Sequence, residues 1–156
     1  MKLKFSIFLI SCLLFIAGIG FAQHASLRNE DALKYVDPYI GSDYHGHVFV
    51  GTNVPYGMIQ LGPSNIHKGW DWCSGYHYSD SILIGFSHTH LSGTGCTDLG
   101  DILIMPLNEI RTPRGNQDDI QGGYASKYSH DNEIVRPEYY SLLVDRYGIK
   151  AELTTT

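Results

Sequence analysis

The sequence predicts an all-β protein, a β-sandwich that is incomplete at its C-terminal end. Composition is the first observation behind this prediction, because hydrophobic residues make up 43% of the chain and charged residues only 17%, with 17 Gly and 11 Tyr. Such a chain is too apolar to stay disordered, and its glycine and aromatic content favours strands over helices. The second observation is that short apolar segments of strand length recur between Gly and Pro, which is typical of sandwiches.

Seven segments follow this pattern, and we expect each to form a strand: Tyr35–Ile40, Val48–Val50, Met58–Leu61, Ile82–Phe86, Ile102–Leu107, Tyr139–Val144 and Ile149–Leu153. In the last two, residues of one face are apolar, and Asp145–Gly148 supplies a turn between them. They predict a hairpin with one face in solvent. Thr112–Asn132 is polar and rich in Gly, Asp and Gln, which indicates a long excursion between strands.

The two ends of the chain differ in character. Met1–Ala22 has the features of an export signal, with lysines at positions 2 and 4, an apolar stretch and small residues before the cut. We therefore expect an exported protein, periplasmic, cell-surface or secreted, with a leader over 23–34 and a sandwich domain over 35–156. A membrane anchor and lipid attachment at Cys12 are the alternatives, and no later segment is apolar enough to span a membrane.

The strand-like alternation runs to Thr156 without a closing turn, so we expect the front part of a longer protein, or else a natural edge strand.

The net charge of the chain bears on which partners it can bind, and its cysteine content bears on disulfide formation. The net charge is −5, and removal of the signal makes the remaining chain more acidic. Nucleic-acid binding depends on Lys and Arg that neutralise phosphates, so we expect no nucleic-acid partner. An exported protein allows Cys73 and Cys96 to form a disulfide, but buried free thiols are equally compatible with the sequence.

Residues 41–101 carry most of the unusual side chains, including six of the 8 histidines and both tryptophans. Proteins bind sugars by stacking aromatic rings on the apolar face of a pyranose and by directing polar groups at its hydroxyls. Gly69–Tyr78 contains four aromatic residues together with Asp71 and His77, which suits this chemistry. The alternative is that Trp70 and Trp72, two positions apart, share a face and fill a core.

Two His-x-His pairs, His45–His47 and His88–His90, each project from one face in an extended chain. Converging pairs would suit zinc, whereas histidines that bond to loop carbonyls are the alternative. Asp98 and Asp101 are equally compatible with turn caps and with a glycosidase carboxylate pair. Nucleophile-elbow, phosphate-loop and dinucleotide motifs are absent from the sequence.

Six blocks of the sequence occur in a characteristic order: Val36–Gly41, His45–His47, Val54–Pro63, Gly69–Tyr76, Gly85–Gly95 and Asp98–Asp101. In sequence and order they resemble the amino-terminal domain of glycoside hydrolase family 92, the exo-acting α-mannosidases best known from Bacteroides-type bacteria. The resemblance covers residues 35 to about 156. It implies a β-sandwich joined to an (α/α) barrel catalytic domain, which this chain lacks, with the active site between the two.

The resemblance also implies a calcium-dependent hydrolysis of mannose-containing glycans, N-glycans or mannan, with inversion at the anomeric carbon. The catalytic carboxylates and the calcium ligands belong to the second domain in this family, so no catalytic residue or metal ligand is assigned here and the chain alone is expected to be inactive. Its expected partners are the glycan and the C-terminal catalytic domain. The alternative function is a standalone carbohydrate-binding module.

Within this chain, the resemblance implies a sugar pocket lined by the Gly69–Tyr78 and Phe86–Gly95 segments. Its leading candidates for ring and hydroxyl contacts are Trp70, Asp71 and His88. The full set of candidate substrate-binding residues is Trp70, Asp71, Trp72, Cys73, His77, His88 and His90.

Overall fold

The structure is a computed structural model that describes residues 32–53, 57–97 and 100–155. The predicted signal, Met1–Ala22, lies outside the described residues, as do Asp98 and most of the leader. The chain divides into two compact units, Met1–Val36 and Asp37–Thr156. In the first unit the described residues form a 3-10 helix, η1 (Leu33–Tyr35). All strands belong to the second unit.

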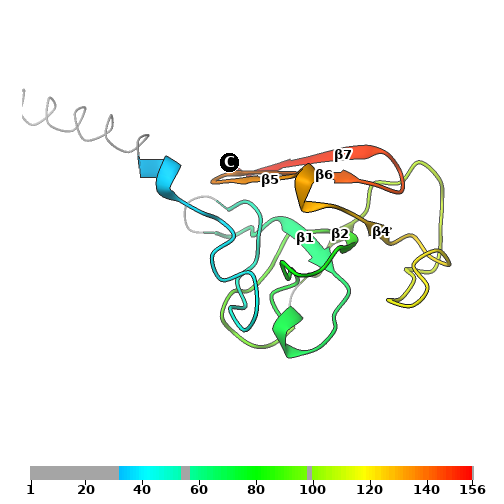
Figure 1. Ribbon diagram of the computed structural model, residues 1–156, viewed down its shortest axis with the longest axis horizontal. Coiled ribbons are helices and arrows are strands. Elements are labelled where there is room, and N and C mark those ends of the chain that lie inside the picture. Colours follow the sequence, from blue (N-terminus) through cyan, green and yellow to red (C-terminus); the bar gives the residue numbers. More distant parts are fainter. Residues whose placement is uncertain (1–31, 54–56, 98–99, 156) are drawn as a thin grey trace, which may run out of the picture. The chain divides into compact units, whose positions relative to one another are not determined.

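Two antiparallel sheets form the second unit (Figure 1). In the first sheet, β2 (Ile82–Ser87) pairs along one edge with β1 (Gly62–Asn65). Along its other edge it pairs with β3 (Leu103–Ile104) and β4 (Ser126–Lys127). The second sheet has the order β5-β6-β7, with bounds Glu133–Arg136, Tyr139–Val144 and Ile149–Thr154.

The main core lies between the two sheets. Leu83 and Phe86 of β2 pack in one cluster with Tyr140, Leu142 and Val144 of β6, all buried. The rings of Phe86 and Tyr140 meet edge to face with centroids 6.2 Å apart. The predicted all-β sandwich is therefore confirmed.

A register shift gives β2 its unusual burial. The pairing passes from Ser64–Gly85 to Asn65–Leu83, which leaves Ile84 as an extra residue on β2. This bulge places Leu83 on the face that looks at the second sheet, whereas Ile84 joins a second cluster with Ala125 on the opposite side. All of β2 is buried because each face of the strand is covered.

The C-terminal hairpin follows the sequence closely. Strands β6 and β7 pair from Tyr139–Thr154 to Val144–Ile149, and the turn is closed by the N–H of Gly148, which donates to the Val144 carbonyl at 2.9 Å. In β7, Ile149 packs against the core and Lys150 is exposed, so the predicted solvent face is confirmed.

Other segments differ from the expectation. Strands are absent from the described parts of Tyr35–Ile40, Val48–Val50 and Met58–Leu61, and a single bridge joins Thr52 to Leu61. Glycine turns interrupt this region and leave too few consecutive residues for a ladder. The excursion Thr112–Asn132 contains the short strand β4 and the 3-10 helix η3 (His130–Asn132).

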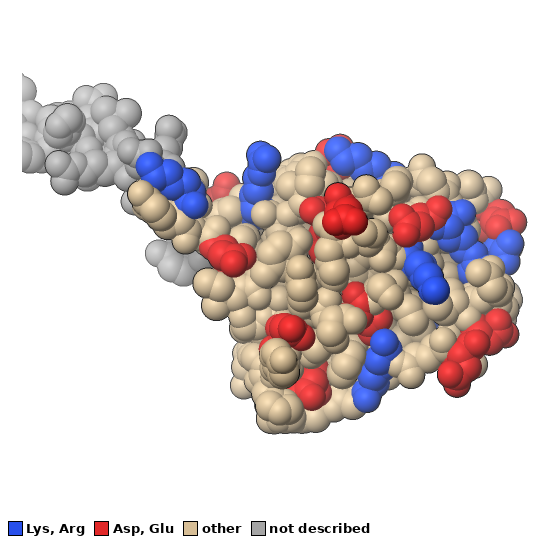
Figure 2. All heavy atoms as spheres, viewed as in Figure 1, with Lys and Arg blue, Asp and Glu red and all other residues tan. Residues whose placement is uncertain are grey.

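Arg146 fixes the central part of that excursion. Its guanidinium Nη1 donates to the carbonyls of Ile120, Gly123 and Ala125 at 2.7–2.9 Å. A polar segment with few apolar residues is thereby held over the first sheet. Within the described ranges, no helix has the length and apolar character needed to cross a membrane. On the face drawn in Figure 2, acidic and basic side chains are interspersed.

Candidate functional site

Glycine turns bring the candidate site loops together. A Cβ at position 46 would lie 2.1 Å from the Gly41 carbonyl oxygen, so only glycine fits there. This tight turn precedes His47, which has a positive φ of 53° and is buried. The His47 carbonyl accepts a hydrogen bond from the N–H of Gly93 at 2.7 Å, which connects this turn to the loop that contains Gly93.

The two tryptophans lie on a 3-10 helix, η2 (Trp70–Trp72). The helix follows Gly69, whose φ is 132°, and is closed by the N–H of Cys73, which donates to the Trp70 carbonyl at 3.1 Å. Because a 3-10 helix has three residues per turn, residues two apart point in different directions. Trp70 is 60% exposed, so the alternative in which both rings share a buried face is wrong.

Trp70 and Asp71 form a surface cluster with His45 and His47, which we call the Trp70–Asp71 cluster. The Asp71 Oδ1 atom accepts hydrogen bonds from His45 Nδ1 at 2.5 Å and from His47 Nε2 at 3.3 Å. The His47 ring meets the Trp70 indole edge to face, with centroids 4.1 Å apart. An exposed aromatic ring and a carboxylate are thereby presented side by side on the surface.

The Asp71 carboxylate is set up to remain ionised. The hydrogen bond from His45 is the largest cause that lowers its pKa. Burial acts in the opposite direction, and the hydrogen bond from His47 lowers the pKa further. Both histidines donate to Oδ1, and among the described residues no group donates to Oδ2. That oxygen is available as an acceptor for a ligand hydroxyl.

Trp72 and His77 lie in a different environment from Trp70. Their rings are stacked at 4.2 Å, and the Trp72 Nε1–H donates to Asp80 Oδ2 at 2.8 Å. Asp80 is buried and also forms a 2.9 Å ion pair with Lys68. The other Asp80 oxygen accepts from the N–H of Ile82, at the start of β2. In this structure Trp72 and His77 therefore fix the loop to the sheet, and direct contact with a sugar stays a prediction.

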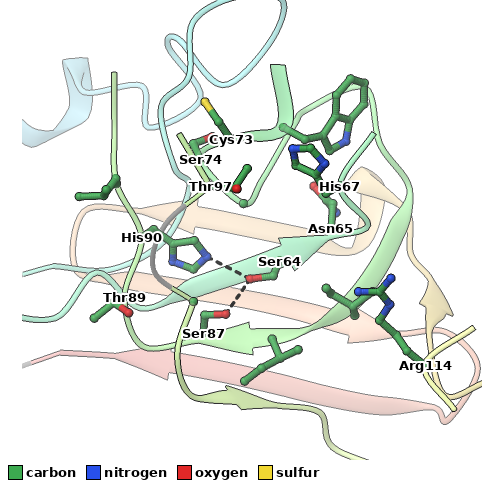
Figure 3. Close-up of a pocket in the computed structure, with 16 residues that line it drawn as sticks. Ser64, Asn65, His67, Cys73, Ser74, Ser87, Thr89, His90, Thr97 and Arg114 are labelled. Atoms are coloured by element: carbon green, nitrogen blue, oxygen red, sulfur yellow. Dashed lines mark hydrogen bonds between the residues drawn. The ribbon is translucent and has the colours of Figure 1, made fainter. Parts of the chain in front are cut away.

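Cys73 and His90 line a cavity of about 280 Å³ on the face of the first sheet opposite the main core. Figure 3 shows the His90, Ser64 and Ser87 side chains pointing toward one another among the lining residues. Cys73 and Cys96 are free thiols: Cys73 is buried, and Cys96 is exposed. The disulfide that the sequence left open is therefore not formed.

His88 is not among the residues that line the cavity. Its N–H donates to the Ile102 carbonyl at 3.3 Å and its carbonyl accepts from the N–H of Gln60, so the backbone is held in the sheet region. The ring atom Nδ1 is buried with no hydrogen-bond partner among the described residues. Among the described residues, no hydrogen bond or ring contact joins the His88 side chain to the Trp70–Asp71 cluster, and its sugar contact remains a prediction.

Sequence reasoning missed a buried carboxylate that holds the site loop in place. Glu133, at the start of β5, accepts hydrogen bonds from the hydroxyls of Tyr140 at 2.6 Å, Tyr76 at 3.1 Å and Tyr39 at 3.2 Å. Burial is the largest cause that raises the pKa of all three tyrosines. The negative charge of Glu133 is the next cause for Tyr39 and Tyr140, and for Tyr76 it follows the interaction with Tyr128. Tyr76 directly follows the loop that carries η2, so Glu133 anchors one end of that loop.

A contact with His130 completes this cluster. His130 Nε2 lies 2.6 Å from the Tyr78 carbonyl, which can only accept, so Nε2 carries a hydrogen. His130 Nδ1 lies 2.6 Å from Glu133 Oε2, and that contact needs a further proton between the two atoms. No local sequence pattern marks Glu133, because its donors come from four separate segments.

The described residues do not supply a metal site. No group of three or more His, Cys, Asp or Glu side chains among them is placed to hold a metal ion. His90 bonds to the Gln60 carbonyl, as the alternative to zinc ligation predicts. Asp101 accepts a long hydrogen bond from Thr89 at 3.4 Å, and its proposed partner Asp98 lies outside the described residues.

Comparisons with known proteins find relatives of this chain among glycosidases. The Glycosyl hydrolase family 92 N-terminal domain matches residues 35–156. An uncharacterized secreted glycosidase of Arthroderma benhamiae is 31% identical over 144 residues, which is 89% of this chain and 18% of the relative. The GH92 α-mannosidase BT3965 of Bacteroides thetaiotaomicron, solved in complex with mannoimidazole, has a TM-score of 0.76 at 44% identity, over 80% of this chain and 16% of its own.

A further solved structure, the GH92 inverting mannosidase BT2199 of the same bacterium, has a TM-score of 0.58 at 27% identity, again over 80% of this chain and 16% of its own. The chain therefore spans less than a fifth of the length of each of these relatives. Because the family match extends over most of the sequence, the chain belongs to glycosyl hydrolase family 92, of which it carries the N-terminal domain.

Proposed function

We propose that this chain is the substrate-pocket domain of an exported, calcium-dependent, inverting exo-α-mannosidase that acts on mannose-containing glycans. The observation that carries the proposal is the exposed Trp70 ring beside the Asp71 carboxylate, in a chain of a glycosidase family. The 44% identity to an α-mannosidase solved with mannoimidazole supports mannose as the sugar. The fungal relative, which is described as secreted, supports export.

The Trp70–Asp71 cluster is suited to bind one sugar ring. An exposed indole stacks on the apolar face of a pyranose, which buries apolar surface from both partners. A carboxylate that stays ionised accepts a strong hydrogen bond from a sugar hydroxyl through its unused oxygen. His45 and His47 hold that carboxylate in one orientation. The entropy cost of ordering the Asp71 side chain when the sugar binds is therefore small.

Bond cleavage requires groups that we place outside this chain. An inverting glycosidase uses one carboxylic acid to protonate the leaving oxygen and a second carboxylate, about 6.5–9.5 Å away, to activate water. Calcium would supply a hard cation for the sugar oxygens. The described residues offer no cluster that fits a metal ion, so we assign its ligands to the second domain and derive no step from it.

Exposed apolar side chains support a covering domain. Met58 is 94% exposed, Ile110 98% and Ile104 65%. Burial of these side chains against another domain would remove apolar surface from water and would be favourable. These residues are therefore candidates for the contact with the catalytic domain.

Sugar binding by the chain tests the proposal directly. Titration with methyl α-D-mannopyranoside should shift the indole N–H signal of Trp70 in ¹H–¹⁵N NMR spectra, and the Trp70→Phe variant assigns that signal. The signal of Ile110, on an exposed loop, serves as the reference. Absence of any Trp70 shift at millimolar mannoside, or an equal shift with methyl α-D-galactopyranoside, would contradict a mannose site.

Activity measurements separate the enzyme from a binding module. We expect no mannose release from α-mannobioses by the chain alone, with or without calcium, and release with inversion by the full gene product. An open reading frame that stops after codon 156, together with sugar binding, would favour a standalone carbohydrate-binding module. Mannose release by the purified chain itself would show that catalytic groups were missed.

A further inference from the structure

The cavity lined by Cys73 and His90 is separate from the Trp70–Asp71 cluster. It has a volume of about 280 Å³, and neither Trp70 nor Asp71 lines it. Its base is formed by β1 and β2, and the segment that follows η2 forms part of its wall (Figure 3). The same loop thus presents Trp70 on the surface and closes this second space.

A hydrogen-bond chain of fixed direction lies in the cavity. His90 Nδ1 is 2.8 Å from the Gln60 carbonyl oxygen, which can only accept, so Nδ1 carries the hydrogen. Burial lowers the pKa of His90, which favours the neutral ring. The other ring nitrogen, Nε2, is then an acceptor and receives the Ser64 hydroxyl hydrogen at 3.1 Å.

The chain ends in an unused acceptor. Because Ser64 has given its one hydrogen to His90, its oxygen accepts the hydrogen of Ser87 at 2.8 Å. Ser87 Oγ has then spent its own hydrogen, and only its lone pairs remain to interact with whatever enters the cavity. All three side chains belong to buried residues, with exposures of 4% for His90, 7% for Ser64 and 2% for Ser87.

Two glycines keep this space open. A Cβ at Gly75, whose φ is +86°, would lie 2.6 Å from His90 Cδ2. A Cβ at Gly100, whose φ is +84°, would lie 3.6 Å from Ser87 Oγ. A side chain at the first position would displace the histidine, and one at the second would occupy space beside the terminal acceptor.

We propose that this cavity is a second binding site that takes one neutral, hydroxyl-bearing ring, a single pyranose unit, which donates a hydroxyl hydrogen to Ser87 Oγ. The volume lies at the lower end of ligand pockets, which suits one ring and excludes an oligosaccharide. A donor is required at Ser87 Oγ, which disfavours a carboxylate or phosphate at that atom, although Arg114 also lines the cavity. The proposal rests on the proposed function, since it adds a second sugar position to the Trp70–Asp71 cluster.

The test uses the intact protein with ¹⁵N-labelled histidine and tryptophan, titrated with methyl α-D-mannopyranoside. We expect the His90 Nε2 signal to shift as the ligand contacts Ser87, because a hydroxyl donated to Ser87 strengthens each following hydrogen bond. The Ser87→Ala variant keeps the Ser64–His90 bond and should weaken the affinity measured at His90 by about three- to tenfold. Ser141→Ala, a buried serine of the other sheet, is the control and should change nothing.

The two proposals fail in different ways. A Trp70 indole that shifts while His90 stays unchanged in the wild-type protein would overturn the cavity site and leave the proposed function standing. If neither signal moves, both proposals fall. Equal affinity at His90 in the wild type and in Ser87→Ala would also overturn the cavity site. Since the wild-type titration needs no substitution, the outcome does not depend on whether the variant folds.

Discussion

Replacement of Trp70 by alanine is the most direct test of the Trp70–Asp71 cluster. Trp70 is 60% exposed, so about 40% of its surface is covered in the folded chain, in part by His47 at a centroid distance of 4.1 Å. For a side chain of roughly 200–250 Å² this is about 80–100 Å², and at about 25 cal/mol per Å² the stability lost is at most about 2.5 kcal/mol. A fully buried tryptophan would cost about 3–5 kcal/mol.

The expected loss in sugar binding is of similar size but concerns a different equilibrium. If the indole stacks on a pyranose, its removal should cost about 1–3 kcal/mol of binding free energy, by analogy with base stacking on aromatic residues. This corresponds to roughly a five- to 150-fold weaker affinity, or the same decrease in kcat/KM for the full enzyme. Trp70→Phe should retain part of the binding, because it retains a ring.

Isothermal calorimetry with methyl α-D-mannopyranoside and urea denaturation separate the two effects. Glu138→Gln, at an exposed position outside the site, is the control and should leave both quantities unchanged. A Trp70→Ala protein with wild-type affinity and a folding loss above about 3 kcal/mol would refute the argument, because the ring would then act in packing and not in binding.

Three further predictions concern the residues that support the site. Glu133→Gln should lower the unfolding free energy by on the order of 3 kcal/mol in urea titrations, since four donors lose their carboxylate, whereas exposed Glu138→Gln should have little effect. Gly75→Ala should cost on the order of 2 kcal/mol and displace the His90 ring, visible as a changed imidazole NMR signal; an unchanged signal and stability would contradict the close approach. Since the pKa of Asp71 is lowered in the folded state, its stabilising contribution is present above the ordinary value of 3.8 and is lost as the pH falls through the lowered value. Asp71→Asn should remove that part of the acid dependence, and an identical pH profile would count against it.

Local patterns in the sequence are enough to predict the C-terminal hairpin and the all-β class. In residues 139–154 the alternation of apolar and polar side chains sets the face that is buried, and the turn residues between the strands set the pairing. The alternation and the turn residues both act between neighbours along the chain, so they can be recognised in the sequence without the tertiary structure. The same holds for the region of the site, where aromatic residues, histidines and glycines crowd together in the sequence.

Which of those side chains act together depends on the packing of segments that are distant in the sequence. It placed Trp70 on the surface and Trp72 against Asp80, because the local backbone is a 3-10 helix and not a strand. It also brought Tyr39 to Glu133 across 94 positions and left Cys73 unpaired. Contacts between distant segments depend on how whole sheets and loops pack and on which polar groups must find partners once buried, and no local pattern encodes that choice.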